Sequence, residues 1–179
     1  QHALEAQSWW FRRILGTKAP LREKMTLFWH DHFATSIKKV KQPVLMMEQN
    51  ALFRKHAFGS FRELTQAIVR DPAMMLYLDT QSSSKSMPNE NFAREVMELF
   101  TLGEGNYTEE DVREAARAFT GFRLNRMNGN VTQSVGAWDG GEKKIFGKAG
   151  KYNGRDVVNL IFEKDACARF MARKFWEFF

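Results

Sequence analysis

The sequence predicts a mostly α-helical protein, a multi-helix orthogonal bundle with one glycine-rich loop or small β-hairpin. Apolar residues recur at helical spacing through most of the chain, and capping residues separate these stretches. The helical period disappears between about 122 and 154, where glycines recur. A chain of 179 residues is long enough for one hydrophobic core. We therefore expect a single helical domain over 1–179 with an irregular insertion at about 122–154.

Helical stretches fill the first part of the chain. Trp9, Trp10 and Ile14 lie at helical spacing before Gly16, and a glycine commonly follows the last turn of a helix. From Met25 onward, apolar side chains recur at i, i+3, i+4 and i+8, with His32 at i+7 on the same predicted buried face. The predicted helices up to residue 79 are a short one ending at Gly16, then 20–35, about 43–58, 60–70, and one beginning at Asp71-Pro72.

The second part of the chain alternates loops and helices. Residues 80–89 are polar and serine-rich, which is typical of a loop. The following helix should bury Phe92, Val96, Leu99 and Phe100 and end at Gly103. The remaining predicted elements are a helix from Thr108 to Gly121, a loop or β-hairpin around 144–146 within the insertion, and helices over 154–162 and 165–179.

The composition restricts the kinds of partner and compartment. The formal charge is +6, but only the short run 37–41 concentrates basic residues, so nucleic-acid binding is not favoured. Cys167 stands alone, which excludes a disulfide within the chain and leaves the compartment open. No apolar run approaches the roughly 18 residues that a membrane span needs, and no signal peptide is visible.

The closing stretch 165–179 is aromatic-rich and helical in pattern, with no polar tail after it. So much apolar surface would be exposed if nothing covered it. We therefore expect a fragment of a longer protein. The remainder of its own chain, or a partner protein, would cover this C-terminal helix.

Three polar side chains interrupt the apolar pattern of the helix that ends at Gly103. At 100° per residue, Asn91, Glu95 and Glu98 form one stripe beside a core face centred about 20° from Phe92. A partly buried carboxylate needs a partner, because an unpaired buried charge is costly. The stripe predicts either a working site with a perturbed pKa or a structural ion pair to an arginine of another helix.

Two histidines are candidates for the same site. His30 and His32 would point about 200° apart on a helix, so they cannot both bind one ion there. Either ring could pair with Glu95 or Glu98 from another helix as an acid–base couple. The alternatives are a hydrogen-bonded core histidine for His32 and a surface residue for His30. A divalent metal is compatible with these residue types, but no spacing requires one, and any other cofactor is unknown.

Several long motifs carry a resemblance to one bacterial family. They are MTLFWHDHFATS at 25–36, DPAMMLYLD at 71–79, PNENFAREVMELFTLGEGNYTEEDVREAARAFTGF at 88–122, NGRDVVNLIF at 153–162 and ARFMARKFWEFF at 168–179. Together they resemble the domain-of-unknown-function family 1800 over nearly the whole chain after about residue 20.

This resemblance implies a bacterial protein that is exported or periplasmic, with an envelope or extracellular role. It transfers no catalytic residues. Members of the family are usually longer, and they tend to be encoded beside a family that resembles sulfatases. They typically carry a His-Asp pair followed by Gly-x-Lys, whereas this chain has Trp138 before Asp139. If that histidine were a ligand or general acid in relatives, this chain would lack it.

Three hypotheses follow for function. The first is an envelope-associated, hydrolase-like enzyme with Glu95, Glu98 and His30 as catalytic residues. The second is a non-catalytic helical binding or assembly module. The third is that the motif residues cap and pair helices within a folding core. The candidate binding residues are His32, Asn89, Asn91, Arg94 and Asp139, and no residue is assigned to a metal.

Overall fold

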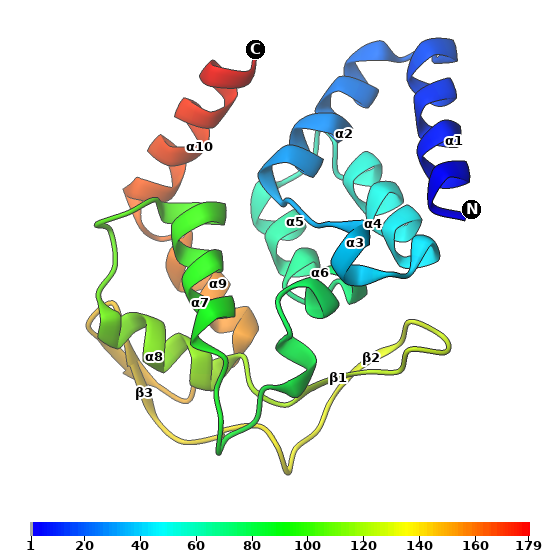
Figure 1. Ribbon diagram of the computed structural model, residues 1–179. Coiled ribbons are helices and arrows are strands. Elements are labelled where there is room, and N and C mark those ends of the chain that lie inside the picture. Colours follow the sequence, from blue (N-terminus) through cyan, green and yellow to red (C-terminus); the bar gives the residue numbers. More distant parts are fainter. Residues whose placement is uncertain (1) are drawn as a thin grey trace.

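The computed structural model describes residues 2–179, which contain ten α-helices and two small antiparallel hairpins (Figure 1). The predicted class, mostly α with a small hairpin, is confirmed. The helices are α1 (His2–Gly16), α2 (Pro20–His32), α3 (Ile37–Val40), α4 (Pro43–Lys55), α5 (Phe61–Ile68), α6 (Pro72–Tyr77), α7 (Glu90–Met97), α8 (Glu109–Ala118), α9 (Gly154–Ile161) and α10 (Asp165–Phe178). A 3-10 turn, η1 (Thr80–Ser82), lies within the predicted loop, and a π-helical turn, η2 (Glu98–Leu102), extends α7.

Helix α2 is shorter than its apolar pattern predicts. It ends at His32, and the chain leaves the helix at Phe33. Thr35 then donates a 2.6 Å hydrogen bond to Gln49 of α4 instead of continuing α2. Ser36 caps the short helix α3, which the sequence pattern missed because a four-residue helix shows no apolar period.

The irregular insertion forms two hairpins instead of one. Strand β1 (Phe122–Leu124) pairs with β2 (Val131–Gln133), and β3 (Lys143–Ile145) pairs with β4 (Lys148–Gly150). Phe146 and Gly147 connect β3 to β4 with φ values of 50° and 80°. Positive φ at both central residues is typical of the type I′ turn that suits a tight hairpin. The second hairpin runs along α8, whereas the first extends below α6 (Figure 1).

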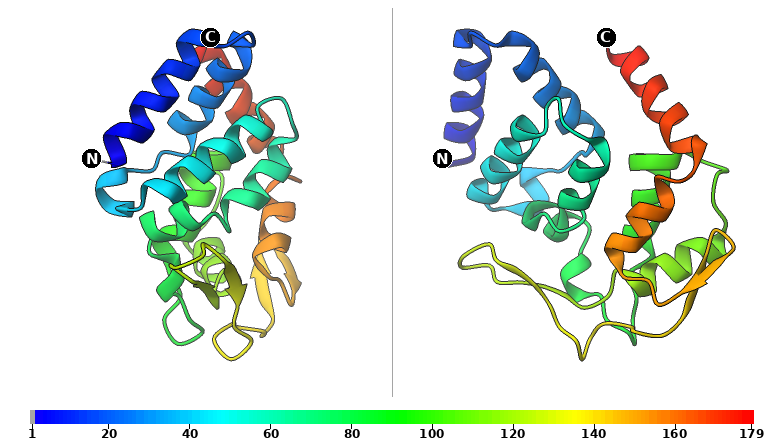
Figure 2. Two further views of the ribbon diagram at one scale, coloured as in Figure 1. Left: turned by 90° about the vertical axis from the view of Figure 1, so that its right-hand side faces the viewer. Right: turned by 180° about the vertical axis from the view of Figure 1, so that it is seen from behind.

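One large hydrophobic cluster draws on most of the helices. Phe33 and Phe53 from the α2–α6 half are fully buried, as are Phe92 and Phe119 from the α7–α9 half. Phe92 and Phe119 pack edge to face with ring centroids 5.1 Å apart, an arrangement that aromatic pairs prefer. Helices cross at steep angles, as α8 does below α7 (Figures 1 and 2).

A buried carboxylate joins the first helices. Glu23 of α2 is 3 % exposed and accepts hydrogen bonds from Arg54 Nε at 2.7 Å and Nη2 at 2.9 Å. It also accepts from Arg13 Nε at 3.1 Å and Trp10 Nε1 at 3.3 Å. The Arg54 hydrogen bonds lower the pKa of Glu23 to about 2. The carboxylate therefore stays charged and fixes α1 and α4 to α2.

Helix α10 covers part of α2 with some of the aromatic residues for which the sequence showed no packing partner. Phe175 and Phe178 lie against Phe28 of α2, with ring centroids 4.5 and 5.1 Å away. Trp176, on the opposite side of the helix, is 87 % exposed. The expectation of exposed C-terminal aromatics thus holds for Trp176 but not for Phe175 or Phe178. Within residues 2–179, no helix has the length and apolar character to cross a membrane.

Candidate functional site

The polar stripe identified in the sequence lies on α7 and its π-helical extension. Asn89 begins α7 by accepting a 3.0 Å hydrogen bond from the Phe92 amide. Its side-chain nitrogen donates to the Leu78 carbonyl at 2.7 Å, which connects α7 to the end of α6. Asn89 therefore has the capping role that the folding-core hypothesis gave it.

The core face of this helix is rotated from its predicted position. Ala93 and Met97 are fully buried, and putting them in place of Leu99 moves the centre of the face to about 70° from Phe92 at 100° per residue. Leu99 then lies at the boundary and is 52 % exposed, so its prediction as a core residue was wrong. Asn91 is exposed on the solvent side, whereas Glu95 and Glu98 remain half-buried.

The π-helical turn η2 determines what lies beside the two glutamates. Its hydrogen bonds span five residues, as in the one from the Gly103 amide to the Glu98 carbonyl at 3.1 Å. The helix ends directly afterwards at Gly103, which has a φ of +76°. The Phe100 carbonyl at this end accepts from a side chain, since His32 Nε2 lies 2.8 Å away.

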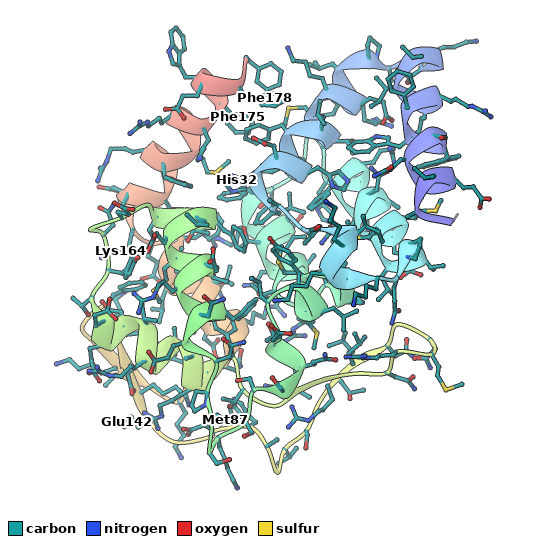
Figure 3. All side chains as sticks on the ribbon, viewed as in Figure 1. His32, Met87, Glu142, Lys164, Phe175 and Phe178 are labelled. Carbon is teal, nitrogen blue, oxygen red and sulfur yellow. The ribbon has the colours of Figure 1, made fainter. Side chains whose placement is uncertain are left out.

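A groove of about 630 Å³ separates α7 and η2 from α2 and α10. Figure 3 shows His32, Phe175 and Phe178 at the facing sides of α2 and α10. Acidic side chains outnumber basic ones along it: five carboxylates against Lys39 and Lys174. The remaining charged and aromatic lining residues are Asp31, Glu95, Glu98, Glu104, Glu177, Phe28, His32, Tyr77, Phe100, Phe170 and Phe178.

Glu98 is held by a chain of polar side chains. It accepts a short hydrogen bond from the Tyr107 hydroxyl. Tyr107 also interacts with Arg94, which in turn donates two hydrogen bonds of 2.7 Å to Glu109. Burial, together with the bond to Glu98, raises the pKa of Tyr107 to about 12, so the phenol stays protonated. The carboxylate of Glu98 is therefore fixed in orientation, and Arg94 pairs with α8 rather than facing the groove.

Glu95 differs from Glu98 in having no hydrogen-bond or ion-pair partner among residues 2–179. Burial and the nearby charge of Glu98 raise the pKa of its carboxyl. A side chain of this kind can exchange protons closer to neutral pH than an ordinary glutamate. Of the two alternatives left open for the stripe, an ion pair of Glu95 with an arginine is not present among residues 2–179.

His32 completes the groove wall as a neutral ring. It is 8 % exposed, and burial lowers its pKa to about 4. A carbonyl oxygen can only accept, so Nε2 carries the hydrogen and donates to Phe100. Nδ1 is then an acceptor, and it is buried without a partner in the described part of the chain. The alternative of a hydrogen-bonded core histidine describes His32 correctly.

His30 lies away from this groove. Its ring packs against Trp10 at 4.5 Å and Phe53 at 4.7 Å between centroids, on the opposite side of α2. Nε2 is 2.9 Å from the side-chain nitrogen of Asn50. The structure therefore places Glu95, Glu98 and His32 together and leaves His30 outside the groove lining. The predicted separation of the two rings about α2 agrees with this placement.

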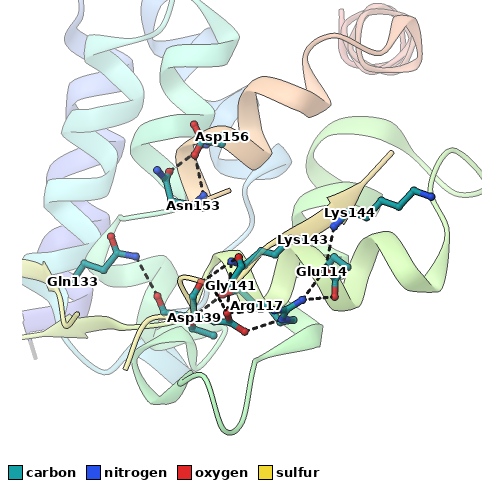
Figure 4. Close-up of polar contacts among 10 residues, drawn as sticks. Glu114, Arg117, Gln133, Asp139, Gly141, Lys143, Lys144, Asn153 and Asp156 are labelled. Atoms are coloured by element: carbon teal, nitrogen blue, oxygen red, sulfur yellow. Dashed lines mark hydrogen bonds and ion pairs between the residues drawn. The ribbon is translucent and has the colours of Figure 1, made fainter. Parts of the chain in front are cut away.

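Asp139 belongs to a separate ion-pair cluster (Figure 4). Its carboxylate accepts from Arg117 Nε at 2.7 Å and from the Gly141 amide at 2.9 Å. These hydrogen bonds, the one from Arg117 foremost, lower its pKa. Lys143, only 1 % exposed, donates to the carbonyls of Asp139 at 2.6 Å and Gly141 at 2.8 Å. Asp139 and Lys143 thus hold the loop before β3 in shape.

Replacing Lys143 with methionine should destabilise this loop. The Lys143→Met side chain keeps the apolar stem but leaves two carbonyls without their donor, which costs about 1–3 kcal/mol. Urea unfolding followed by circular dichroism measures the change. Lys144→Met, on the exposed side of the same strand, is the control. Equal stabilities of the two variants would contradict the loop-holding role.

Sequence reasoning missed the residues from other parts of the chain that line the groove or hold Glu98 in place. Tyr107 follows the helix in a turn, and Phe170 and Lys174 come from α10. No local pattern marks them, because their position depends on how the helices pack. Within residues 2–179, no three His, Cys, Asp or Glu side chains are grouped so that they could hold a metal ion.

Comparison with known proteins gives one match. The model of the family described as "Protein of unknown function (DUF1800)" matches residues 1–179, which is the whole chain. No curated protein and no solved structure matches the chain. The family match agrees with the motifs in 25–36 and 88–122, which supply the α2 and α7 sides of the groove. The chain belongs to the DUF1800 family.

Proposed function

We propose that the groove between α2, α7 and α10 is the site of a hydrolase-like enzyme in which Glu95 is the general acid–base. The observation that carries this proposal is the half-buried Glu95 carboxyl, which has a raised pKa and no partner in the described chain. General bases work best when their pKa is near the working pH. The free position of Glu95 also leaves its oxygens available to a water molecule.

The neighbours of Glu95 supply the remaining roles. Glu95 takes a proton from the attacking water and returns it to the leaving group, so its charge is restored after each turnover. Glu98, oriented by Tyr107, keeps a negative charge nearby that favours the protonated form of Glu95. The neutral His32 ring lines the groove, and its hydrogen bond to the Phe100 carbonyl holds the end of η2 beside the two glutamates.

The lining of the groove suggests what the substrate carries. Its excess of carboxylates favours a positively charged group, and its phenylalanine rings favour an adjacent apolar portion. An envelope polymer or small molecule with both features fits this description. This role requires an exported or periplasmic location. Fractionation of cells that express the natural protein tests that location.

A panel of chromogenic esters, amides and glycosides, each with and without an ammonium group, tests the enzyme hypothesis. We expect Glu95→Gln to reduce kcat/KM by about 10²–10⁴, the usual contribution of a general acid–base. Its melting temperature should change little, because Glu95 has no partner to lose. Glu104→Gln, at an exposed position of the same groove, is the matched control. A large loss of stability in Glu95→Gln with unchanged turnover would instead support a structural role.

The alternative is a binding or assembly module that uses the same groove without chemistry. The aromatic walls and the exposed Trp176 of α10 favour it. Titration calorimetry with phenylethylammonium and spermidine distinguishes the two functions. A module would bind such cations in the wild-type chain and in Glu95→Gln, and would hydrolyse none of the panel. A partner protein or further chain at α10 belongs to this alternative.

A further inference from the structure

A second cavity lies on the other side of α2 from the groove. It occupies about 400 Å³ between α1, α2, α4 and the segment that contains α3. The residues of its lining that matter here are Trp9, Trp10, His30, Lys38, Met47 and Asn50. Because none of these lines the groove, the inference drawn from this cavity is independent of the proposed hydrolase-like function.

His30 presents one unused hydrogen-bond donor at this cavity. The Asn50 nitrogen 2.9 Å from Nε2 is a donor, so Nε2 must accept and the ring hydrogen sits on Nδ1. Nδ1 has no hydrogen-bond partner among residues 2–179. Burial, with a smaller effect of Arg54, lowers the pKa of His30 to about 4, which keeps the ring neutral.

The walls of the cavity are aromatic and adaptable. The Trp10 ring lies 4.5 Å from the His30 ring, and Phe53 fixes the other side of His30 at 4.7 Å. Met46 and Met47 of α4 form the facing wall. Methionine side chains adjust to irregular apolar ligands, and tryptophan offers a large flat contact. Such walls suit a small ring or a short alkyl chain.

The charged side chain that lines this cavity is basic. Lys38 lines it, and no aspartate or glutamate does so. The Lys38 ammonium has no hydrogen-bond or ion-pair partner in the described chain. Of the carboxylates on α2, Glu23 is already engaged by Arg54 and Arg13, and Asp31 lines the groove and not this cavity. An anionic group would therefore find a cation and a neutral N–H donor here, with no carboxylate opposing it.

We propose that this cavity binds a small apolar monocarboxylate, such as an aromatic or medium-chain carboxylic acid. The carboxylate accepts from His30 Nδ1 and pairs with Lys38, while the apolar part lies between Trp10 and Met47. Ligands of this size bury most of their surface in a pocket and are oriented by a few polar groups.

Titration calorimetry of the full chain with benzoate, phenylacetate, indole-3-acetate and octanoate tests the proposal. We expect at least one acid to bind with a Kd below about 1 mM, and its primary amide to bind about tenfold more weakly, as the loss of a charge-assisted hydrogen bond predicts. The proposal is wrong if none of the acids binds at a concentration about tenfold above that Kd, or if the amides bind as tightly as the acids.

Variants locate the site. Lys38→Gln should weaken binding about tenfold, whereas Lys55→Gln, at an exposed position of α4, should not. Met47→Trp should abolish binding by filling the cavity, and circular dichroism checks that it folds. Binding that survives Met47→Trp in a folded chain places the acid elsewhere and overturns the assignment. Glu95→Gln should leave binding unchanged, so failure of the hydrolase-like function and failure of this proposal are separate results.

Discussion

Glu23→Gln is expected to lower the free energy of unfolding by about 3–5 kcal/mol, the cost of removing one charge from a buried ion pair. The carboxylate of Glu23 is almost completely buried and accepts from Arg54, Arg13 and Trp10. Glutamine keeps the shape but leaves Arg54, itself only 12 % exposed, without its counter-charge. Urea unfolding at pH 7 measures the loss. Glu142→Gln, on an exposed loop, is the control and should change stability by less than about 0.5 kcal/mol.

The Glu23 carboxylate also makes the free energy of unfolding depend on pH. The pKa of Glu23 is about 2 in the folded chain and 4.5 ordinarily. Because the folded-state pKa is the lower one, the stabilisation is complete above pH 4.5 and is lost as the pH falls through 2. The stability difference between the wild-type chain and Glu23→Gln should therefore shrink over that range. A difference that stays constant with pH would contradict the role of the charge.

Phe33→Ala should lower stability by about 3–5 kcal/mol, as expected for removing a buried phenylalanine ring. Phe33 is completely buried at the point where α2 ends. Its ring contacts Phe100 at 5.2 Å and His32 at 4.7 Å between centroids, so the cavity would open directly behind the groove. Thermal and urea unfolding measure the effect. Phe58→Ala removes a ring that is 61 % exposed and should cost far less; similar losses in both variants would show that Phe33 is not a core anchor.

Features that depend on neighbouring residues could be predicted from the sequence. Asn89, Thr108 and Asp71 each accept a hydrogen bond from the backbone amide three residues further along the chain, and each marks a helix start in the pattern. Gly103 ends its helix with positive φ, as glycine after an apolar period suggests. These local rules are sufficient for the helix order, apart from the four-residue α3.

The candidate site was predictable only in part. Glu95 and Glu98 are half-buried as their stripe indicated, but Asn91 is exposed. The error came from leaving Ala93 and Met97 out of the core face, since alanine is a weak apolar signal even where it is fully buried. The partners of the site, Tyr107 and the α10 residues, depend on long-range packing. His30 and His32 required the same information, because spacing shows that they diverge but not what each one faces.

The extra residue in η2 changes the angular position of every later residue of this helix about its axis. A π-helical turn accommodates one residue more than the α-helical turn it replaces, so excising Leu99 would let the coil run on with regular pitch. The Phe100 carbonyl would then point toward a following amide, and the imidazole of His32 would lose its acceptor. Deletion of a single codon here would thus remove the hydrogen bond between α2 and the end of η2, although no side chain of α2 had been altered.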